Sequence, residues 1–546
     1  MSCKTKLDFS SGHMWFESRS GVRVTAMDTK LEKFVSELGG CGLFQVYLSV
    51  AVYTIKTVGA WGVLFLTFGT YNPGWTCADD SGNTTDVNST LVLSTSTPNN
   101  ITDSGQENCA TWHSCSDIRF DPESSTIVSE WGLICDRAWL GPLTISIQMV
   151  GMTISSLLGG VLAERFGRKF SMYLWVWLGI VLNGVAVFST SWEMYAAIRF
   201  LIGLSVGGNL VTSQIYALEF VTAKWRVILT GLPTWNIAGL LFGLCVLLLK
   251  NWRHVHIATA VLSACVFLTV FWVPESMRWL AIHGKAKKTR EVAQKICRIN
   301  KRPKLDESSL DFTNCEGRRD DKKVSIRQLF RPDLRKRTIV CCTVYFLMSV
   351  MYYSIGFGIG SLYGNFYTNF LLFSLFGMPV SPLATFLGHK LGRRWGSVTL
   401  LGTAGLFSFT VVVVYFKTSV EVGGQVITLL ALTTSVLVDH CWGILITFIA
   451  ELFPTPVRVL SFGFVFTAAR IGSIVSPLLI PRDFSVLYVS YIIMAVMATV
   501  TCALVLSMPE TKDRGLEDKL HGVERFKPKK TDEYFNDNVP LMEENE

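Results

Sequence analysis

The stretch GVLAERFGRK, residues 160–169, decides the fold. It follows the second of twelve apolar segments, and a shorter version of its ending, Gly392-Arg393-Arg394, follows the eighth. The offset between Arg168 and Arg393 is 225 residues. One such match can arise by chance, so we compared the ends of the other apolar segments.

Two more motifs recur at a similar offset. Glu219 ends the fourth apolar segment and Glu451 ends the tenth, 232 residues later. The pair Pro274-Glu275 ends the sixth segment and Pro509-Glu510 ends the twelfth, 235 residues later. Three matches in the same order indicate a duplicated unit of six segments. Parallel repeats of six helices around a site at the membrane midplane are typical of one large class of secondary transporters.

The apolar segments are long enough to cross a bilayer. Half of all residues are hydrophobic and only 17% are charged, whereas a soluble domain has roughly 25% charged residues. A helix needs about 20 apolar residues to cross ~30 Å of hydrocarbon, and the solidly apolar segments exclude a β-barrel, whose strands alternate. We therefore predict an all-α membrane protein with twelve helices in two six-helix bundles, over residues 43–69, 139–162, 170–190, 193–217, 227–249, 255–274, 338–360, 366–388, 396–416, 425–450, 457–480 and 486–508.

Lysine and arginine are distributed unevenly between the loops. The central loop 276–337 contains nineteen of them, and the first loop 71–138 contains two against ten acidic residues. Because positive residues gather on the cytosolic side, the net charge of +8 indicates membrane orientation rather than nucleic-acid binding. We predict a multi-pass protein with cytosolic termini, organised as a cytosolic segment 1–42, bundles 43–275 and 338–508, cytosolic loop 276–337 and cytosolic tail 509–546.

The first loop also has the marks of an extracellular segment. It contains three glycosylation sequons, which begin at Asn83, Asn88 and Asn100. Together with four cysteines, they predict that the loop lies in an oxidising, glycosylating compartment. Four cysteines allow three disulfide pairings, and the sequence does not choose among them. The four are Cys77, Cys109, Cys115 and Cys135.

Residues 160–169 resemble the signature between helices two and three of the major facilitator superfamily. Within that superfamily the chain resembles the organic cation, organic anion and carnitine transporter family. The motifs that carry this resemblance are IVSEW (127–131), PESMRWL (274–280) and ELFPTPVR (451–458), and the large glycosylated first loop agrees with it. The resemblance implies a plasma-membrane secondary transporter that moves small organic ions by alternating access, with helices one, four, seven and ten lining a central cavity and helix eleven beside it.

The sequence departs from this family at positions where a substrate would bind. Gly377 stands two residues before Pro379, where the family usually has an acid, and Ser435 stands where many members have a lysine. Arg470 agrees with the anion and carnitine branches, whereas the cation branch has an aspartate at that position. The family's substrates therefore cannot be transferred directly to this chain.

Four ionisable residues lie near the middle of predicted membrane helices, where charge is expensive and usually functional. They are Lys56, Asp439, His440 and Arg470. Asp439 and Arg470 can also form a structural ion pair, Lys56 can extend to the interface, and His440 can be a proton relay or a packed, hydrogen-bonded residue. The excess of positive charge favours an organic anion or a carnitine-like zwitterion over a simple cation. Aromatic residues, Trp235 and Tyr352 among them, can surround a cationic head group or simply pack.

Charged residues at the cytosolic helix ends are the candidate gate. Ion pairs between the halves would close the cytosolic side in the outward-facing state and break when the halves rock. The alternative is that these are ordinary charges at membrane edges. The candidates are Glu164, Arg165, Arg168, Glu219, Arg226, Glu451 and Arg458.

Other functional classes find less support in the sequence. No phosphate loop, metal-ligand pair or HExxH motif is present, so we expect no enzyme activity, no cofactor and no metal. A receptor or sensor built on the same scaffold, an organic cation transporter, and an adhesion protein that uses its glycosylated loop remain as alternatives. The expected partners are a small organic ion and the lipid bilayer, and the coupling ion stays unknown.

Overall fold

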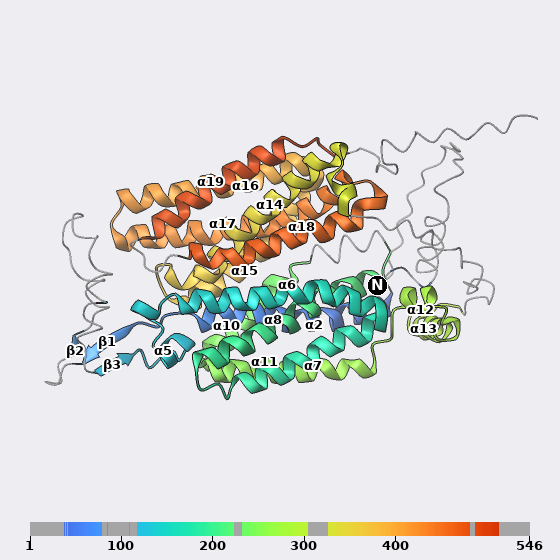
Figure 1. Ribbon diagram of the computed structural model, residues 1–546, viewed down its shortest axis with the longest axis horizontal. Helices are drawn as coiled ribbons and strands as arrows, with labels where there is room; N and C mark the ends of the chain where they lie inside the picture. The colour runs from blue at the N-terminus through green and yellow to red at the C-terminus, as the bar shows by residue number, and fades with distance from the viewer. Residues whose placement is uncertain are drawn as a thin grey trace, which may run out of the picture.

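The computed structural model describes residues 38, 40, 42–78, 84–85, 109, 117–222, 232–303, 326–480 and 486–512. Eleven helices in these ranges are long and apolar enough to cross a membrane. A twelfth apolar helix, α10 (Thr234–Leu249), has 16 residues and begins directly after Pro233. These helices, arranged in two bundles, confirm the predicted twelve-helix fold (Figure 1).

The N-terminal half contains six of the helices. Side-chain caps fix where several of them begin: the Ser191 hydroxyl accepts from the N–H of Met194, and Asn251 accepts from the N–H groups of Arg253 and His254. The first helix begins and ends at the predicted residues. The six are α2 (Leu43–Gly69), α6 (Leu140–Phe166), α7 (Arg168–Ala186), α8 (Trp192–Leu218), α10, and α11 (Trp252–Phe267) with its 3-10 extension Leu268–Phe271.

The C-terminal half repeats this arrangement. Two prolines, Pro379 and Pro382, lie inside its second helix and remove backbone hydrogen bonds there. Its members are α14 (Pro332–Phe357) with the 3-10 turn Gly358–Ser361, α15 (Phe366–Lys390), α16 (Arg393–Lys417), α17 (Val420–Leu452), α18 (Thr455–Val475) with the 3-10 turn Ser476–Leu479, and α19 (Leu487–Leu506).

The two halves lie side by side with their helices running along the long axis of the molecule (Figure 1). They meet chiefly through α6 against α18 and α10 against α15. Hydroxyl groups cross the junction: Ser146 donates to the carbonyl of Ile474 at 2.9 Å, and Thr67 donates to that of Gly356 at 3.2 Å. The halves are therefore two bundles joined along a seam, which the site described below interrupts.

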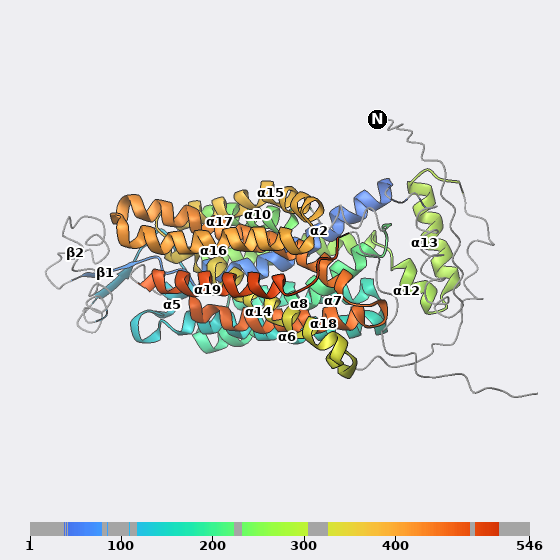
Figure 2. The same cartoon turned by 90° about the horizontal axis from the view of Figure 1, so that it is seen from above.

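The two ends of the bundle carry different structures (Figure 2). One end carries a small antiparallel sheet of order β2-β1-β3, formed by β1 (Trp75–Ala78), β2 (Thr84–Thr85) and β3 (Asp117–Phe120). The short helix α5 (Ile127–Trp131) follows the sheet. We call this the sheet end, and the opposite end, which carries α12 (Met277–Ile282) and α13 (Ala286–Ile299), the α13 end.

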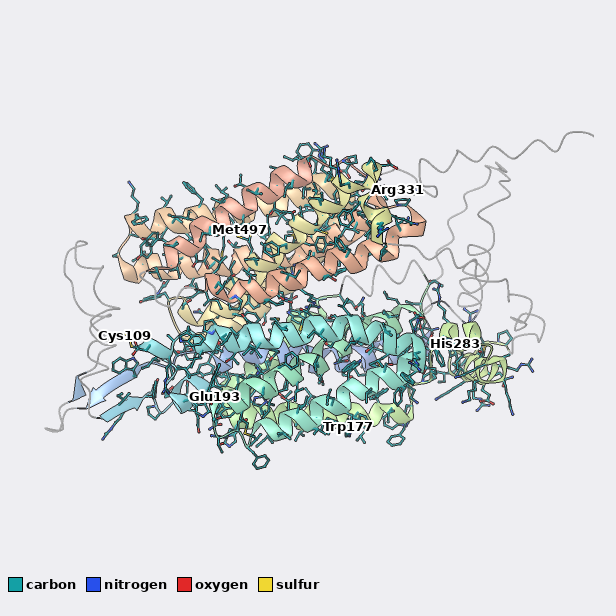
Figure 3. The ribbon with its side chains drawn as sticks, in the orientation of Figure 1. Cys109, Trp177, Glu193, His283, Arg331 and Met497 are labelled. Atoms are coloured by element: carbon teal, nitrogen blue, oxygen red, sulfur yellow. A yellow bond between two sulfur atoms is a disulfide. The ribbon has the colours of Figure 1, made fainter. Side chains whose placement is uncertain are left out.

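A disulfide lies at the sheet end. Cys109 is bonded to Cys135, which is one of the pairings that the sequence allows, and Figure 3 shows Cys109 beside the strands. The backbone of Cys77 belongs to β1. Cys115 and the three sequon residues, Asn83, Asn88 and Asn100, lie outside the described residues.

The central loop contains helical structure that the sequence analysis treats as loop. Helix α13 buries Ala293 and Ile296 against the beginning of α2, around Phe44. The Asn300 side chain fastens this contact, because it accepts from the N–H of Phe44 at 2.9 Å and donates to the carbonyl of Leu38 at 2.7 Å. Figure 3 places His283, between α12 and α13, at this end.

Candidate functional site

A cavity of about 1130 Å³ lies between the two halves. Helices α2, α6, α8 and α10 line it from one side, and α15, α17 and α18 from the other. It reaches the α13 end, since Leu218, His389 and Arg393 at the ends of α8, α15 and α16 belong to its wall. The cavity is large enough for a small organic ion.

One expectation from the family resemblance is not met in this state of the cavity. Helix seven, α14, contributes no residue to the described wall of the cavity, and Tyr352 on it is buried, with 8% of its surface exposed. Tyr352 lies behind the wall, next to Asp439 and Trp235, and its ring packs edge-on against Tyr353. Trp235, in contrast, lines the cavity as predicted. Tyr352 can therefore support a ligand only through its neighbours.

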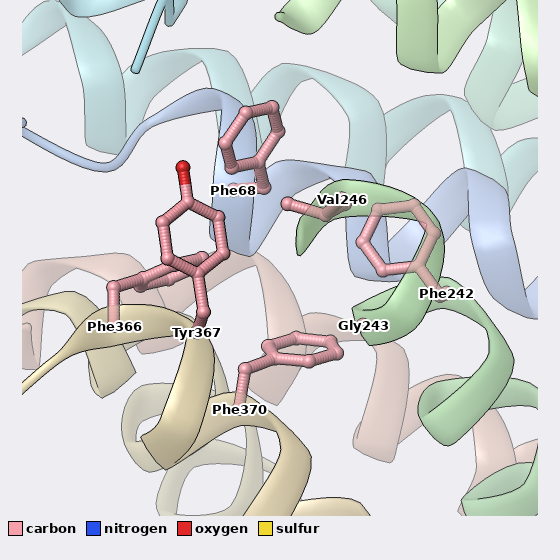
Figure 4. A pocket seen from close by; sticks show the side chains of 7 residues that line it. All are labelled: Phe68, Phe242, Gly243, Val246, Phe366, Tyr367 and Phe370. Carbon is pink, nitrogen blue, oxygen red and sulfur yellow. The ribbon is translucent and has the colours of Figure 1, made fainter. Parts of the chain in front are cut away.

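Aromatic rings of the two halves pack together at the sheet end, outside the wall of the cavity (Figure 4). The Tyr71 ring stacks on Phe366 with centroids 4.4 Å apart, and the hydroxyls of Ser124 and Tyr367 are 2.7 Å apart. Burial, with Tyr367 and Asp121 nearby, raises the pKa of Tyr71 to about 12, so its hydroxyl is neutral at physiological pH. We call the following residues the aromatic seal: Phe68, Tyr71, Phe242, Phe366, Tyr367 and Phe370.

All four predicted mid-membrane residues line the cavity: Lys56 from α2, Asp439 and His440 from α17, and Arg470 from α18. Lys56 Nζ donates to Oε1 of Gln214 and lies 5.3 Å from the centroid of the Tyr53 ring. Asp439 and Arg470 form no ion pair with each other. The structure therefore brings two cations and one acid into one chamber without neutralising them.

His440 takes part in the packing of α17 against α15. Its Nε2 donates to the backbone carbonyl of Gly377 at 2.8 Å, across from α17 to α15. A Cβ atom added at Gly377 would overlap the amide of Asn236 on α10, which also lines the cavity. The family's usual acid therefore has no room at this position, because an asparagine from the other half fills the space.

The N-terminal half has a charge cluster at the α13 end. The Arg168 guanidinium donates to Glu164 at 3.0 Å and to Glu219 at 3.2 Å. The carboxylate of Glu275 accepts from the backbone N–H groups of Arg168 and Lys169, both at 3.0 Å. The cluster therefore ties the beginning of α7 to the ends of α8 and α11.

The C-terminal half contains the same cluster at the repeat positions. Arg393 donates to Glu451 at 2.9 Å, and Glu510 accepts from the backbone N–H groups of Arg393 and Arg394 at 3.0 and 3.1 Å. Burial alone would raise the pKa of the Glu510 carboxyl, but these and other backbone hydrogen bonds hold it below its usual value. The offsets found in the sequence thus correspond to one repeated structure.

A glycine completes each cluster. Gly167 and Gly392 have φ angles of +108° and +95°, a region that L side chains rarely adopt. A Cβ atom at either position would also collide with the carboxylate of Glu275 or Glu510. The turn therefore requires a glycine, and the glutamate carboxylate can approach the backbone closely because the glycine has no side chain.

Four of the predicted gate residues, Glu164, Arg168, Glu219 and Glu451, pair within their own half. The ion pairs of Arg168 with Glu164 and Glu219, and of Arg393 with Glu451, each join residues of the same half. Arg165 lies over the Phe166 ring, Arg458 donates to the carbonyl of Phe453 at 3.2 Å, and Arg226 lies outside the described ranges. In this state the cavity reaches the same end, so pairs between the halves remain a prediction for the opposite state.

Two residues in the interior of the N-terminal half, Arg199 and His256, were not predicted from the sequence as functional. Arg199 is fully buried, and its three guanidinium nitrogens have no hydrogen-bond partner among the described residues. An isolated buried ion costs several kcal/mol, whereas a desolvated cation–π contact returns about 2 kcal/mol. Arg199 lies near one end of its apolar segment, so in the sequence it resembles a charge at the membrane interface. It could have been identified as a candidate because arginine is rare inside membrane-spanning segments.

Comparison with known proteins agrees with this fold. The model of the sugar (and other) transporter family matches residues 87–519. Human solute carrier family 22 member 13 is 28% identical over 414 residues, 73% of this chain and 72% of the relative. Human organic cation/carnitine transporter 2 is 26% identical over 430 residues, 77% of this chain and 75% of the relative.

A solved structure shares the architecture. The xylose transporter XylE from E. coli, in an inward-open conformation, superimposes with a TM-score of 0.59 at 15% identity, covering 86% of this chain and 98% of that one. At this identity the likeness concerns the fold alone. The family match covers most of the chain and shows that the protein belongs to the sugar (and other) transporter family of the major facilitator superfamily, with solute carrier family 22 members and organic cation/carnitine transporters among its relatives.

Proposed function

We propose that this protein is a plasma-membrane secondary transporter that moves organic anions or carnitine-like zwitterions by alternating access. The charge inventory of the cavity is the observation that carries the proposal. Lys56, Arg470 and Asp439 all line one chamber, and Asp439 is not paired with Arg470. A bound organic ion is then the natural partner for these charges, because charges inside a membrane protein are usually paired.

The arrangement of the charges favours a carboxylate. Gln214, the partner of Lys56, is neutral and supplies no counter-charge, and Arg470 offers a planar fork of donors that matches a carboxylate or sulfate. Asp439 supplies the single acid, near Trp235, where a zwitterion could place its ammonium group. A simple cation would meet a net positive wall, and Gly377 cannot supply the acid that the family usually has there.

The two ends of the cavity support alternating access. The aromatic seal closes the sheet end, and the cavity reaches the α13 end. If the sequon-bearing loop is extracellular, this state faces the cytosol. Several relatives are named organic cation/carnitine transporter 2, and that name covers both the proposed zwitterion and the alternative, an organic cation.

The decisive experiment compares uptake of L-carnitine, an aryl monocarboxylate and tetraethylammonium by the full-length protein in proteoliposomes. We expect uptake of the zwitterion or the anion to exceed that of the cation, with sodium, pH and voltage varied in turn to identify the coupling. Preferred uptake of tetraethylammonium would contradict the charge argument. Binding of these solutes without uptake of any would instead support a receptor.

A further inference from the structure

A buried positive charge that has no counter-charge among the described residues lies inside the N-terminal half, away from the transport cavity. Arg199 is on α8, is 0% exposed, and has no hydrogen-bond acceptor for Nε, Nη1 or Nη2 among the described residues. Unlike Lys56, it does not belong to the cavity wall, so an organic substrate in the cavity does not reach it. A guanidinium cannot release its proton in a protein, so the charge persists.

Neighbouring groups do not provide an acceptor. The Arg199 guanidinium carbon lies 4.4 Å from the centroid of the Phe65 ring and 5.6 Å from that of Tyr195. His256 Nδ1 lies 2.9 Å from Oδ1 of Asn183 and must donate to it, because the Asn183 amide nitrogen donates to a backbone carbonyl. In neutral His256 the other nitrogen, Nε2, is then an acceptor for the Tyr195 hydroxyl at 3.2 Å. Tyr195 and His256 thus satisfy each other, and the guanidinium is left with ring faces.

We propose that Arg199 binds a small inorganic anion of the halide class, such as chloride, in the interior of the N-terminal half. Buried charges are usually paired in proteins. Contacts with aromatic ring faces offset only part of the free energy that the guanidinium loses when it leaves water. The anion must be small, because Phe65, Tyr195 and His256 surround the guanidinium closely. It must also be a fixed counter-ion rather than cargo, since Arg199 is separate from the cavity wall.

Helix α5 covers this region at the sheet end. The Trp131 ring lies 5.3 Å from Tyr195 and 5.5 Å from Trp252 between centroids. An ion pair of 2.9 Å between Arg253 and Glu130 fastens α5 to α11. The anion would therefore be enclosed beneath an aromatic cover and stabilise the folded half by mass action.

Thermal melting of the purified full-length protein tests the proposal. Melting is followed by tryptophan fluorescence in sodium chloride, sodium bromide and sodium gluconate at equal ionic strength. We expect chloride and bromide to raise the melting temperature by several degrees in a saturable manner, and gluconate, which is too large, to leave it unchanged. Arg199→Gln should abolish the difference between the salts, and Arg470→Gln, which removes an arginine from the cavity, should retain it.

A second variant keeps the proposal testable if Arg199→Gln does not fold. Arg199→Lys keeps the charge but has fewer donors, so its half-saturation should move to about tenfold higher chloride. Equal melting of the wild-type protein in chloride and gluconate would overturn the proposal. So would a chloride effect that persists unchanged in Arg199→Gln, or one that disappears in Arg470→Gln and thereby belongs to the transport cavity.

Discussion

Arg470 and Asp439 lie on consecutive helices in the wall of one cavity, and neither neutralises the other. We predict that Arg470→Ala reduces uptake of the anion or zwitterion about tenfold or more, because a charge-assisted hydrogen bond contributes about 1.5–3 kcal/mol. Arg470→Asp should move selectivity toward cations. The measurement is initial uptake of the three probe ions, normalised to the amount of protein at the cell surface.

Arg470→Lys is the matched control, since it keeps the charge without the planar fork. We expect it to retain more anion uptake than Arg470→Ala. If the wild-type protein transports tetraethylammonium well and Arg470→Ala does so equally, the ligand role of Arg470 is wrong and its function is structural.

The contact between Gly377 and Asn236 carries a second prediction at the level of single residues. Gly377→Ala should lower uptake several-fold, because the new methyl group would overlap the Asn236 amide across the two halves. Gly377→Asp combined with Asn236→Ala should recover folding and increase tetraethylammonium uptake, since the acid then has room. Gly443→Ala is the control, because Gly443 also lines the cavity and a Cβ there meets open space. Equal effects of Gly377→Ala and Gly443→Ala would contradict this explanation.

At the level of elements, the paired charge clusters fix helix ends within each half. Arg168→Ala should reduce transport at least several-fold while surface expression remains largely intact. The reason is that Arg168 joins α7 to α8 in this state, and the gate hypothesis requires it to change partner in the other state. The double variant Glu219→Gln with Glu451→Gln should behave similarly. Uptake and surface biotinylation provide the measurements.

The control for this cluster is Arg335→Ala, an exposed arginine near the beginning of α14 at the same end of the molecule. We expect it to transport as the wild type does. Normal uptake in both Arg168→Ala and the double glutamine variant would show that the clusters are ordinary charges at a membrane edge.

The positions of most helices are predictable, because the length of an apolar segment and the spacing of repeated motifs can be read directly from the sequence. Helix α2 begins and ends where its apolar segment does, and the charge clusters lie at the offsets read from the sequence. The position of α14 behind the cavity wall depends on packing between helices, so the sequence alone did not place Tyr352 behind that wall. Helix α13 could have been recognised, because Thr289, Ala293 and Ile296 recur at helical spacing among lysines and arginines.

At the scale of the whole molecule, the aromatic seal keeps the sheet end closed. Phe366→Ala removes the ring that stacks on Tyr71 and should shift the population toward the state that opens at the sheet end. Truncation of a buried phenylalanine costs about 3–5 kcal/mol, and about 1.4 kcal/mol already changes a population tenfold. A cysteine introduced at Thr153 in the cavity wall should then react several-fold faster with an impermeant maleimide added at the sheet end.

Phe409→Ala is the matched control for the seal, because Phe409 on α16 is 59% exposed on the outside of the bundle. It should leave the labelling rate unchanged. Equal labelling in the Phe366→Ala and wild-type backgrounds would mean that the seal does not determine which end is open.

The orientation of the whole chain carries the last prediction. Deglycosylation should increase gel mobility if the first loop is extracellular, and replacing Asn83, Asn88 and Asn100 together with glutamine should abolish that shift. Immunoblotting of membranes from expressing cells provides the measurement. A shift that remains in the triple variant would contradict the sequon assignment or the orientation.

The two charge clusters become complete at different times while the chain is synthesised. Every member of the first cluster is present once residue 275 has been made, whereas the second waits for Glu510. Ribosomes add about 5–20 residues per second, so synthesis from Glu275 to Glu510 takes roughly 10–50 s. During this time the first half can form the ion pairs and hydrogen bonds at its helix ends, before the second half can form its own. Each half can therefore leave the translocon with the charge cluster at its helix ends already paired, and the seam between the halves can form last.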